Sequence, residues 1–261
     1  MPEVKSYQPG MFCWTDLGTT DVAAAKRFYG DLFGWTYEDI QTPMGPYGMA
    51  YLGGKDVAAV NALSADQAKQ GVPPHWNLYF SVKNLDESAK RATSLGGKLL
   101  LPPMDATEAG RMAVVADPSG ASFCLWQAKS HPGAKLVNEP GAINWAELEC
   151  RNVEGCKAFY SELFGWRHDT QDMGGMPYTV FKAGEEQRAG MMPMAKGSPA
   201  DRPSHWTVYF TAASCDATAK KAQGAGAKIV VPATDVPQVG RFAMCQDPQG
   251  ALFAFLQPAR R

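Results

Sequence analysis

The chain has 261 residues, of which 45% are hydrophobic and 20% charged, an ordinary composition for a globular protein. Its formal net charge of −1 and the absence of a basic stretch exclude the electrostatic match to a phosphate backbone that nucleic-acid binding needs. No apolar stretch approaches a membrane span, and the first ten residues lack the apolar core of a secretion signal. We therefore expect a cytoplasmic protein with neither nucleic-acid nor membrane partners.

The first elements expected along the chain are a strand and a helix. Phe12 to Leu17 mixes apolar and polar residues of β-favouring types, which predicts a strand with two different faces. Apolar residues then recur at helical spacing from Val22 to Leu32, with Thr20 or Asp21 available as N-cap and Gly34 suited to the left-handed position past the end. A strand leading into an amphipathic helix is predicted.

Three antiparallel strands should follow, and then the same pattern begins again. The three strands are predicted at residues 35–38, 47–52 and 56–61. The second series consists of a strand at 76–82, a helix at 85–95 ended by Gly96-Gly97, and strands at 98–101, 111–116 and 121–127. The last two strands are joined by a tight turn at Asp117-Pro118-Ser119-Gly120. The pattern βαβββ is thus written twice within about half of the chain.

The whole pattern then recurs in the second half. The phrase FYGDLFGW at 28–35 returns as FYSELFGW at 159–166, and DPSGASFCLWQ at 117–127 returns as DPQGALFAFLQ at 247–257. The spacing is 131 residues for the first phrase (28 to 159) and 130 for the second (117 to 247), so one residue is missing in a loop of the second copy. We predict two copies of one domain, at 1–128 and 141–261, joined by a linker at 129–140 that carries no periodicity.

These two duplicated phrases resemble the vicinal oxygen chelate superfamily, which includes glyoxalase I, bleomycin resistance proteins and extradiol dioxygenases. The resemblance covers nearly the whole chain and implies an α+β fold, with tandem domains whose two βαβββ modules each form an open barrel around a cavity. It also implies a small-molecule ligand or substrate, and in many members a divalent metal held by His and Glu side chains.

Among the residues at the metal-ligand positions implied by this resemblance, only Cys124 and, weakly, Asn77 could donate to a metal. The residues at these positions are Trp14, Asn77 and Cys124 in the first copy, and Trp145, Thr207 and Ala254 in the second. A further position falls among residues 57–61 and 189–192, which contain neither His nor a carboxylate. Divalent metals need several imidazole, thiolate or carboxylate donors around one point. We therefore expect neither a metal centre nor another cofactor.

Strand alternation predicts which other side chains face the two cavities. Asp16 should accompany Trp14, and Glu147 should accompany Trp145. On the fifth strand of each copy, the residues expected on this face are His75, Asn77 and Tyr79, and His205, Thr207 and Tyr209. Counting outward from the last hairpin turn pairs Ala113 with Cys124 and Arg111 with Trp126, which would bring Arg111 and its counterpart Arg241 to the cavities.

Each of these residues has a structural and a functional interpretation. Asp16 with His75, and Glu147 with His205, are either structural hydrogen-bonded pairs or general bases in which the acid orients the imidazole. The tryptophans either fill the space of a metal or stack on a ligand. The arginines either anchor an anionic ligand or pair with Asp16 and Glu147. Cys124 is most simply a buried, inert thiol, and His131 a surface residue.

Two classes of function remain open. One is a glyoxalase-like enzyme, a lyase or an oxygenase, acting on a carbonyl or aromatic substrate without the usual metal ligands. The other is a non-catalytic binding protein of the bleomycin-resistance type, whose cavities hold a flat or hydrophobic molecule. The duplication leaves both a monomer and a homodimer possible. The six cysteines form no CxxC pair and are expected to be free thiols.

Overall fold

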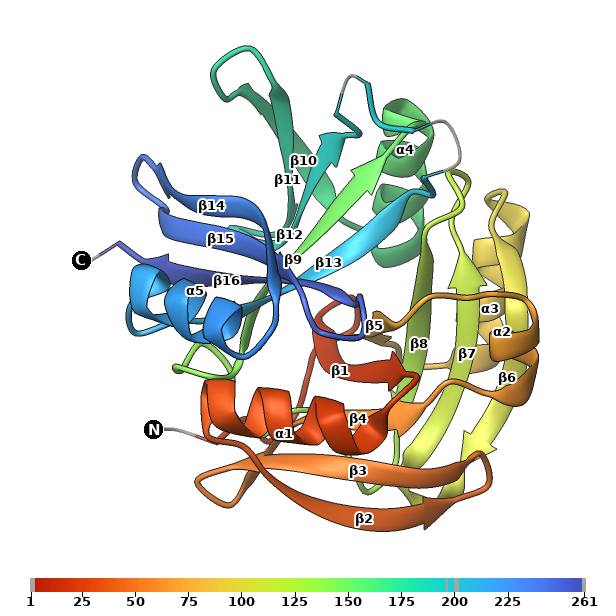
Figure 1. Ribbon diagram of the computed structural model, residues 1–261. Coiled ribbons are helices and arrows are strands. Elements are labelled where there is room, and N and C mark those ends of the chain that lie inside the picture. Colours follow the sequence, from red (N-terminus) through yellow and green to blue (C-terminus); the bar gives the residue numbers. More distant parts are fainter. Residues whose placement is uncertain (1–2, 196, 200–201, 260–261) are drawn as a thin grey trace.

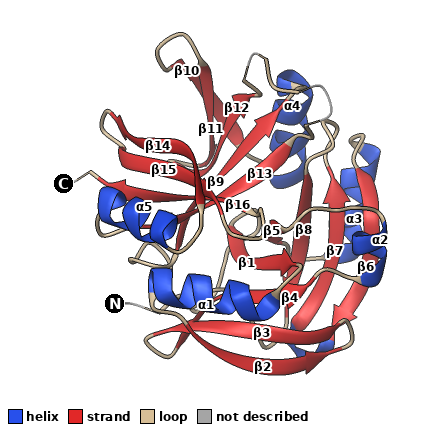
Figure 2. Cartoon of the chain, in the orientation of Figure 1, coloured by secondary structure: helices blue, strands red, loops and turns tan. Residues whose placement is uncertain are grey.

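The computed structural model describes residues 3–195, 197–199 and 202–259 and contains two eight-stranded sheets. The strand order is β2-β3-β4-β1-β5-β8-β7-β6 in the first sheet and β10-β11-β12-β9-β13-β16-β15-β14 in the second. The orders are identical once the copies are aligned, so the two halves share one topology (Figures 1 and 2). This is the tandem α+β arrangement of βαβββ modules expected from the sequence.

The first half contains eight strands, three α-helices and one short 3₁₀ turn among its described residues. They are β1 (Phe12–Thr19), α1 (Val22–Phe33), β2 (Thr36–Thr42), β3 (Gly45–Leu52), β4 (Lys55–Ala62), α2 (Ala65–Lys69), β5 (His75–Ser81), α3 (Leu85–Ser94), β6 (Lys98–Ala106), η1 (Thr107–Ala109), β7 (Gly110–Ala116) and β8 (Ser122–Ala128).

The second half repeats this series without equivalents of α2 and η1 in its described part. Its elements are β9 (Ile143–Cys150), α4 (Val153–Phe164), β10 (Arg167–Asp172), β11 (Pro177–Ala183), β12 (Glu186–Pro193), β13 (His205–Thr211), α5 (Cys215–Gly224), β14 (Lys228–Val236), β15 (Gly240–Gln246) and β16 (Leu252–Pro258).

Local sequence signals explain where the helices begin and end. The Asp21 side chain accepts a hydrogen bond from the Ala24 N–H and caps α1, while Gly34 adopts the left-handed conformation (φ 78°) just past its end, as predicted. Helix α2 was not predicted, although Ser64 and Gln67 form a capping box at its start. Strand β6 runs five residues beyond the predicted end at Leu101, to Ala106.

Each sheet has one face covered by helices and one free of them, which we call the helix-free face. Within the first sheet Leu17, Trp76 and Leu78 face the helices, whereas Trp14 and Tyr79 face the other way. This alternation follows from the two-residue period of a strand. The polar and aromatic side chains of β1, β5, β9 and β13 that could bind or react therefore lie on the helix-free faces.

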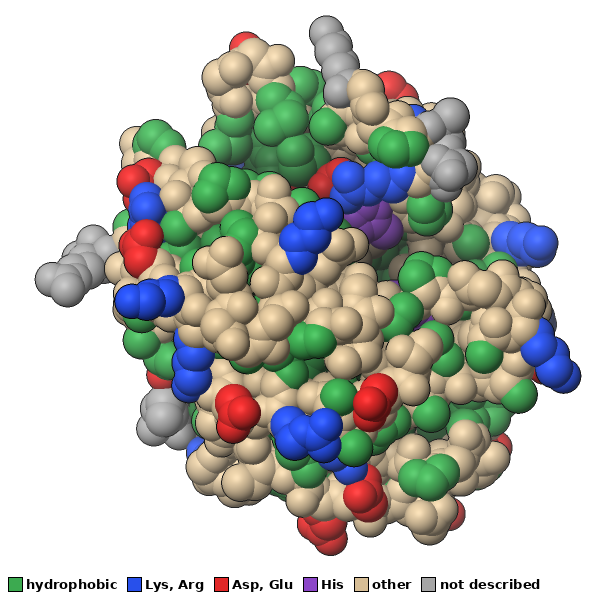
Figure 3. All heavy atoms as spheres, viewed as in Figure 1, with side chains coloured by type: hydrophobic (Ala, Val, Ile, Leu, Met, Phe, Trp, Pro, Cys, Tyr) green, Lys and Arg blue, Asp and Glu red, His purple; other side chains and the backbone are tan. Residues whose placement is uncertain are grey.

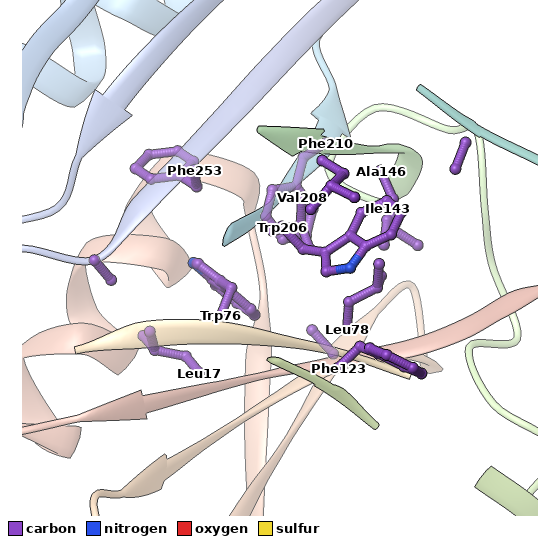
Figure 4. Packing of buried hydrophobic residues seen from close by; sticks show 14 of the residues in the cluster. Leu17, Trp76, Leu78, Phe123, Ile143, Ala146, Trp206, Val208, Phe210 and Phe253 are labelled. Carbon is purple, nitrogen blue, oxygen red and sulfur yellow. The ribbon is translucent and has the colours of Figure 1, made fainter. Parts of the chain in front are cut away.

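The helix-covered faces of the two sheets share a single hydrophobic core. Phe210 of β13 packs against Phe33, Trp35 and Trp76 of the first domain, and Phe80 of β5 makes the equivalent contacts with Phe164, Trp166 and Trp206. Figure 4 shows side chains of both domains together in this core, with Trp76 below Phe210 and Phe253. The copies are interlocked rather than joined only by a linker.

The duplicated sequence phrases meet reciprocally across this interface. Tyr29 of the first phrase donates a hydrogen bond to Asp247 Oδ2 at 3.0 Å, and Tyr160 donates to Asp117 Oδ2 at 2.9 Å. Each tyrosine oxygen also accepts an indole N–H, from Trp76 and Trp206 respectively. The phrases that reveal the duplication thus hold the two domains together.

Replacing Tyr160 by phenylalanine is expected to lower the free energy of unfolding by about 1–3 kcal/mol, because the Trp206 N–H loses its acceptor and Asp117 loses a donor in a buried site. Urea denaturation measures the loss, and Tyr29→Phe should give a similar value. Tyr51→Phe is the control, since this hydroxyl makes only a 3.5 Å bond to Glu38 at the surface. A loss no larger than that of the control would contradict the proposed interface bond.

All six cysteines are buried and unpaired in the structure. Among the residues that the structure describes, no helix is long and apolar enough to span a lipid bilayer.

Candidate functional site

The pairing of β1 with β5 brings four of the predicted residues together on the helix-free face of the first sheet. Trp14 lies opposite Tyr79, and Asp16 lies opposite Asn77. The second copy repeats this register, with Trp145 opposite Tyr209 and Glu147 opposite Thr207. Cross-strand neighbours on one face lie about 5 Å apart, so each carboxylate sits among aromatic and polar side chains.

Asp16 is buried and fully bonded. Its Oδ2 accepts hydrogen bonds from the hydroxyls of Tyr79 at 2.6 Å and Tyr47 at 2.9 Å, and its Oδ1 accepts from Asn77 Nδ2 at 2.8 Å. Trp14 Nε1 donates to the Tyr47 hydroxyl at 2.8 Å, which extends the chain of bonds. Burial raises the pKa of Asp16, although the three donors act in the opposite direction.

The second copy contains the same chain with one member fewer. Tyr209 donates to Glu147 Oε1 at 2.7 Å, and Trp145 Nε1 donates at 3.1 Å to the hydroxyl of Tyr178, which in turn acts to lower the pKa of Glu147. Burial and the nearby Glu149 carboxylate raise the pKa of Glu147. Thr207 replaces the amide of the first copy, and its buried hydroxyl has no hydrogen-bond partner among the described residues.

The helix-free face of the first sheet is covered by two segments from outside the sheet. His131 stands edge-on to Trp14, with 4.7 Å between ring centroids, and its carbonyl oxygen accepts the Trp126 indole N–H. The Ala134 N–H bonds the Cys13 carbonyl, and Tyr7 donates to the Ala134 carbonyl. His131 was expected at the surface, but the segment after β8 carries it onto this apolar cluster instead.

On the helix-free face of the second sheet, the hydrophobic cluster of described residues contains no segment from outside that sheet. Its hydrophobic cluster contains residues of β9 and β13–β16 only: Trp145, Tyr209, Val231, Phe242, Met244, Leu252, Ala254 and Leu256. Trp145 is half-buried, whereas Trp14 retains only 4% of its surface. Figure 3 shows hydrophobic side chains in a hollow between the β10–β11 hairpin and β14. The two copies therefore differ in access.

The predicted pairs Asp16 with His75 and Glu147 with His205 are diagonal neighbours across the strands rather than directly opposite residues, and His75 is close enough to act to lower the pKa of Asp16. His75 lies opposite Gly18, and His205 lies opposite Glu149. The offset arises because Asp16 lies opposite Asn77 and Glu147 opposite Thr207, each two residues beyond the histidine on its strand. A carboxylate therefore faces the histidine across the strands only in the second copy, and it is Glu149 rather than Glu147.

The two arginines also lie elsewhere than predicted. Arg111 pairs with Gln127 across the hairpin, and its guanidinium bonds Asp86 of α3 at 2.7 Å on the helix side of the sheet. Arg241 bonds Asp216 of α5 and Asp235 at 2.9 Å. The cause is a turn one residue longer than counted, in which Asp117 accepts the N–H groups of Ser119 and Ala121. A one-residue shift of register moves a side chain to the other face.

The same register leaves Cys124 and Trp126 on the helix-free face, opposite Val114 and Met112. Cys124 is buried, and burial raises the pKa of its thiol well above its usual range, so it is not poised as a nucleophile.

Four residues of these sites were not found from the sequence. Tyr47 and Tyr178 repeat at the spacing of 131 residues, so the duplication itself carried that signal. Glu149 lies two residues beyond Glu147 and shares its face by strand alternation. Arg202 lies in the loop before β13, where no periodic pattern could place it.

Comparison with known proteins agrees with the duplicated fold. The family model of the glyoxalase/bleomycin resistance protein/dioxygenase superfamily matches residues 12–125 and 142–255. The chain belongs to this superfamily. It is 43% identical, over 99% of both chains, to CFP32 of Mycobacterium tuberculosis, which is provisionally named a glyoxylase. It is 34% identical to the anthracycline biosynthesis protein DnrV of Streptomyces peucetius, over 96% of this chain and 94% of that protein.

Solved structures of this superfamily share the fold at low sequence identity. The Mn(II)-bound glyoxalase of Novosphingobium aromaticivorans superimposes with a TM-score of 0.66 at 16% identity, over 96% of this chain and 82% of that one. The 2,2',3-trihydroxybiphenyl 1,2-dioxygenase of Sphingomonas wittichii gives 0.65 at 11% identity, over 96% and 91%.

The residues present do not fit the divalent metal that many members of the superfamily hold. At the corresponding positions the indoles of Trp14 and Trp145 donate hydrogen bonds to tyrosines and offer no lone pair to a cation, and Asn77, whose Nδ2 donates to Asp16, could supply only a neutral amide oxygen. Among the described residues, no group of three or more His, Cys, Asp or Glu side chains could hold a metal ion.

Proposed function

We propose that this chain is a glyoxalase-like enzyme that acts on a small carbonyl or aromatic compound at the helix-free face of its second domain. The observation that carries the proposal is the difference in cover: His131 stands over Trp14, whereas Trp145 is half-buried within a cluster of its own sheet. A pocket with an apolar floor and a few convergent polar groups suits a small organic ligand.

The polar groups of this face are arranged in a row beside its apolar part. Along β9 and β13 the facing pairs are Trp145 with Tyr209, Glu147 with Thr207, and Glu149 with His205. The unpartnered Thr207 hydroxyl supports the presence of a ligand oxygen in this row, because a buried hydroxyl without a partner costs about 1–3 kcal/mol. The relatives named for a glyoxylase and for anthracycline biosynthesis support a small-molecule substrate.

Titration with 2-hydroxyacetophenone, which combines an aromatic ring, a carbonyl and a hydroxyl, tests where the ligand binds. Saturable quenching of tryptophan fluorescence is expected in the wild type and in Trp14→Phe, but at least half of the signal should disappear in Trp145→Phe. Trp14 and Trp145 are matched by the duplication, so the pair separates the two faces. Quenching that is lost in Trp14→Phe and kept in Trp145→Phe would contradict the assignment.

A second candidate function is ligand binding without catalysis. The partly buried Val231, Phe242, Leu252 and Leu256 favour it, since they form an apolar surface that a flat molecule can cover. Saturable quenching without any conversion of bound compounds would support this candidate over the enzyme.

A further inference from the structure

His205 has a defined protonation pattern in this structure. Its Nδ1 lies 3.1 Å from the carbonyl oxygen of Pro203, an acceptor only, so Nδ1 carries the hydrogen of the neutral ring. Nε2 is therefore the bare nitrogen, and it lies 3.4 Å from Nη2 of Arg202, which has hydrogens to donate. In the neutral tautomer that fits these two partners, the basic nitrogen is directed to a guanidinium.

Two further charged groups adjoin this ring. Glu149 on β9 lies directly opposite His205 and is 3.7 Å from Arg202, measured from Oε2 to Nη2. Arg151 bonds the carbonyl oxygens of Pro199 and Arg202 and so fastens the loop that carries Arg202. Burial lowers the pKa of His205 and Arg202 acts in the same direction, whereas the Pro203 carbonyl and Glu149 raise it.

The first domain contains the matching histidine, His75, without counterparts of Glu149 and Arg202. His75 keeps the carbonyl partner, with Nδ1 2.8 Å from the Pro73 oxygen. Gly18 stands opposite it in place of Glu149, and the position 130 residues before Arg202 is Val72. The carbonyl contact is thus a property of the strand entrance in both copies; Asp16 also lies near His75, but the directly opposite acid and the guanidinium belong to the second copy alone.

We propose that His205, Arg202 and Glu149 form a proton-transfer centre for a carbonyl compound that has a C–H bond next to its carbonyl group. This inference rests on the proposed function and names its reacting groups. The C–H bond breaks, its proton is taken by Nε2 of His205, and its electron pair moves into the carbonyl to give an enolate. Arg202 holds the enolate oxygen, and the Glu149 carboxylate keeps the guanidinium in place.

The reaction class follows from the balance of this step. The proton on Nε2 returns to the neighbouring carbon or to oxygen, so the product is an isomer or, in D₂O, the deuterated starting compound. No electrons leave the substrate, and no oxidant or reductant is required. An imidazole whose pKa is lowered is unprotonated at neutral pH, so its Nε2 lone pair is available to accept a proton.

Deuterium exchange into 2-hydroxyacetophenone in D₂O, followed by proton NMR of its CH₂ group, tests the proposal. The wild type should accelerate exchange, His205→Asn should lose about 10²–10⁴-fold, and Arg202→Gln should lose at least about tenfold. His75→Asn should leave the rate unchanged. The rate should fall in acid, as His205 becomes protonated, with a midpoint below the ordinary imidazole value of about 6.5.

A second readout does not depend on turnover. NMR titration of the histidine Cε1–H signals should show a higher pKa for His205 in Arg202→Gln and a lower one in Glu149→Gln. Unchanged values in both variants, or exchange equally fast in the wild type and His205→Asn, would overturn the proposal. If 2-hydroxyacetophenone still quenches Trp145 while exchange is absent, the proton-transfer centre is refuted and the binding site of the second domain stands.

Discussion

Replacing Phe210 by alanine is expected to lower the free energy of unfolding by about 3–5 kcal/mol. The ring is fully buried and contacts Phe33, Trp35 and Trp76 of the other domain, so its removal leaves a cavity that interlocked aromatic rings cannot easily fill. Guanidinium chloride denaturation followed by circular dichroism measures the loss. The pseudo-symmetric Phe80→Ala should give a loss of the same order.

Phe242→Ala is the matched control, because this ring is half-buried on the helix-free face of the second sheet and lies outside the shared core. Its loss should be clearly smaller. Because the core is continuous across both domains, the wild type should unfold in one transition. Two separate transitions, with Phe210→Ala affecting only the one assigned to the second domain, would contradict the shared core.

Replacing Asp16 by alanine is expected to cost about 3 kcal/mol, since Tyr79 would keep a buried donor, and Tyr47 and Asn77 partly buried donors, without an acceptor. The measurement is again the free energy of unfolding. Asp16→Asn should lose less, because the amide keeps one oxygen for these donors.

Glu147→Ala provides the comparison within the same chain. It removes the acceptor for Tyr209, and Thr207 makes no bond to Glu147 that could be lost, so the loss of stability should be smaller than that of Asp16→Ala. Equal losses would argue against the view that the first network is the more completely bonded one. A larger loss at Glu147 would reverse the assignment of the structural and the functional copy.

The hydrogen-bond network around Asp16 and the one around Glu147 differ at one partner position of the carboxylate. Asn77 and Thr207 occupy the same position, yet only the amide is long enough to reach the carboxylate opposite it. Together with the cover provided by His131, this makes the first site a closed structural unit. We expect the chain to bind ligand at one face per molecule, although it has two copies of the domain.

The sequence by itself determined the duplication, the order of the strands and the main helices, and the faces of the residues on β1, β5, β9 and β13. These features depend on local rules: the two-residue period of strands, the helical spacing after Asp21, and the left-handed Gly34. They were sufficient to place Trp14 with Asp16, Asn77 with Tyr79, and their counterparts, on common faces.

Only the tertiary structure decided which of these side chains meet. Strand register depends on turn length and on pairing between distant segments. The turn at Asp117 is one residue longer than expected, which places Arg111 on the opposite face from the site. The pairing of β9 with β13 places His205 opposite Glu149. The cover over Trp14, and the approach of Arg202 from its loop, depend on segments without periodicity. Local pattern cannot encode such contacts, because they arise from the packing of parts far apart in the chain.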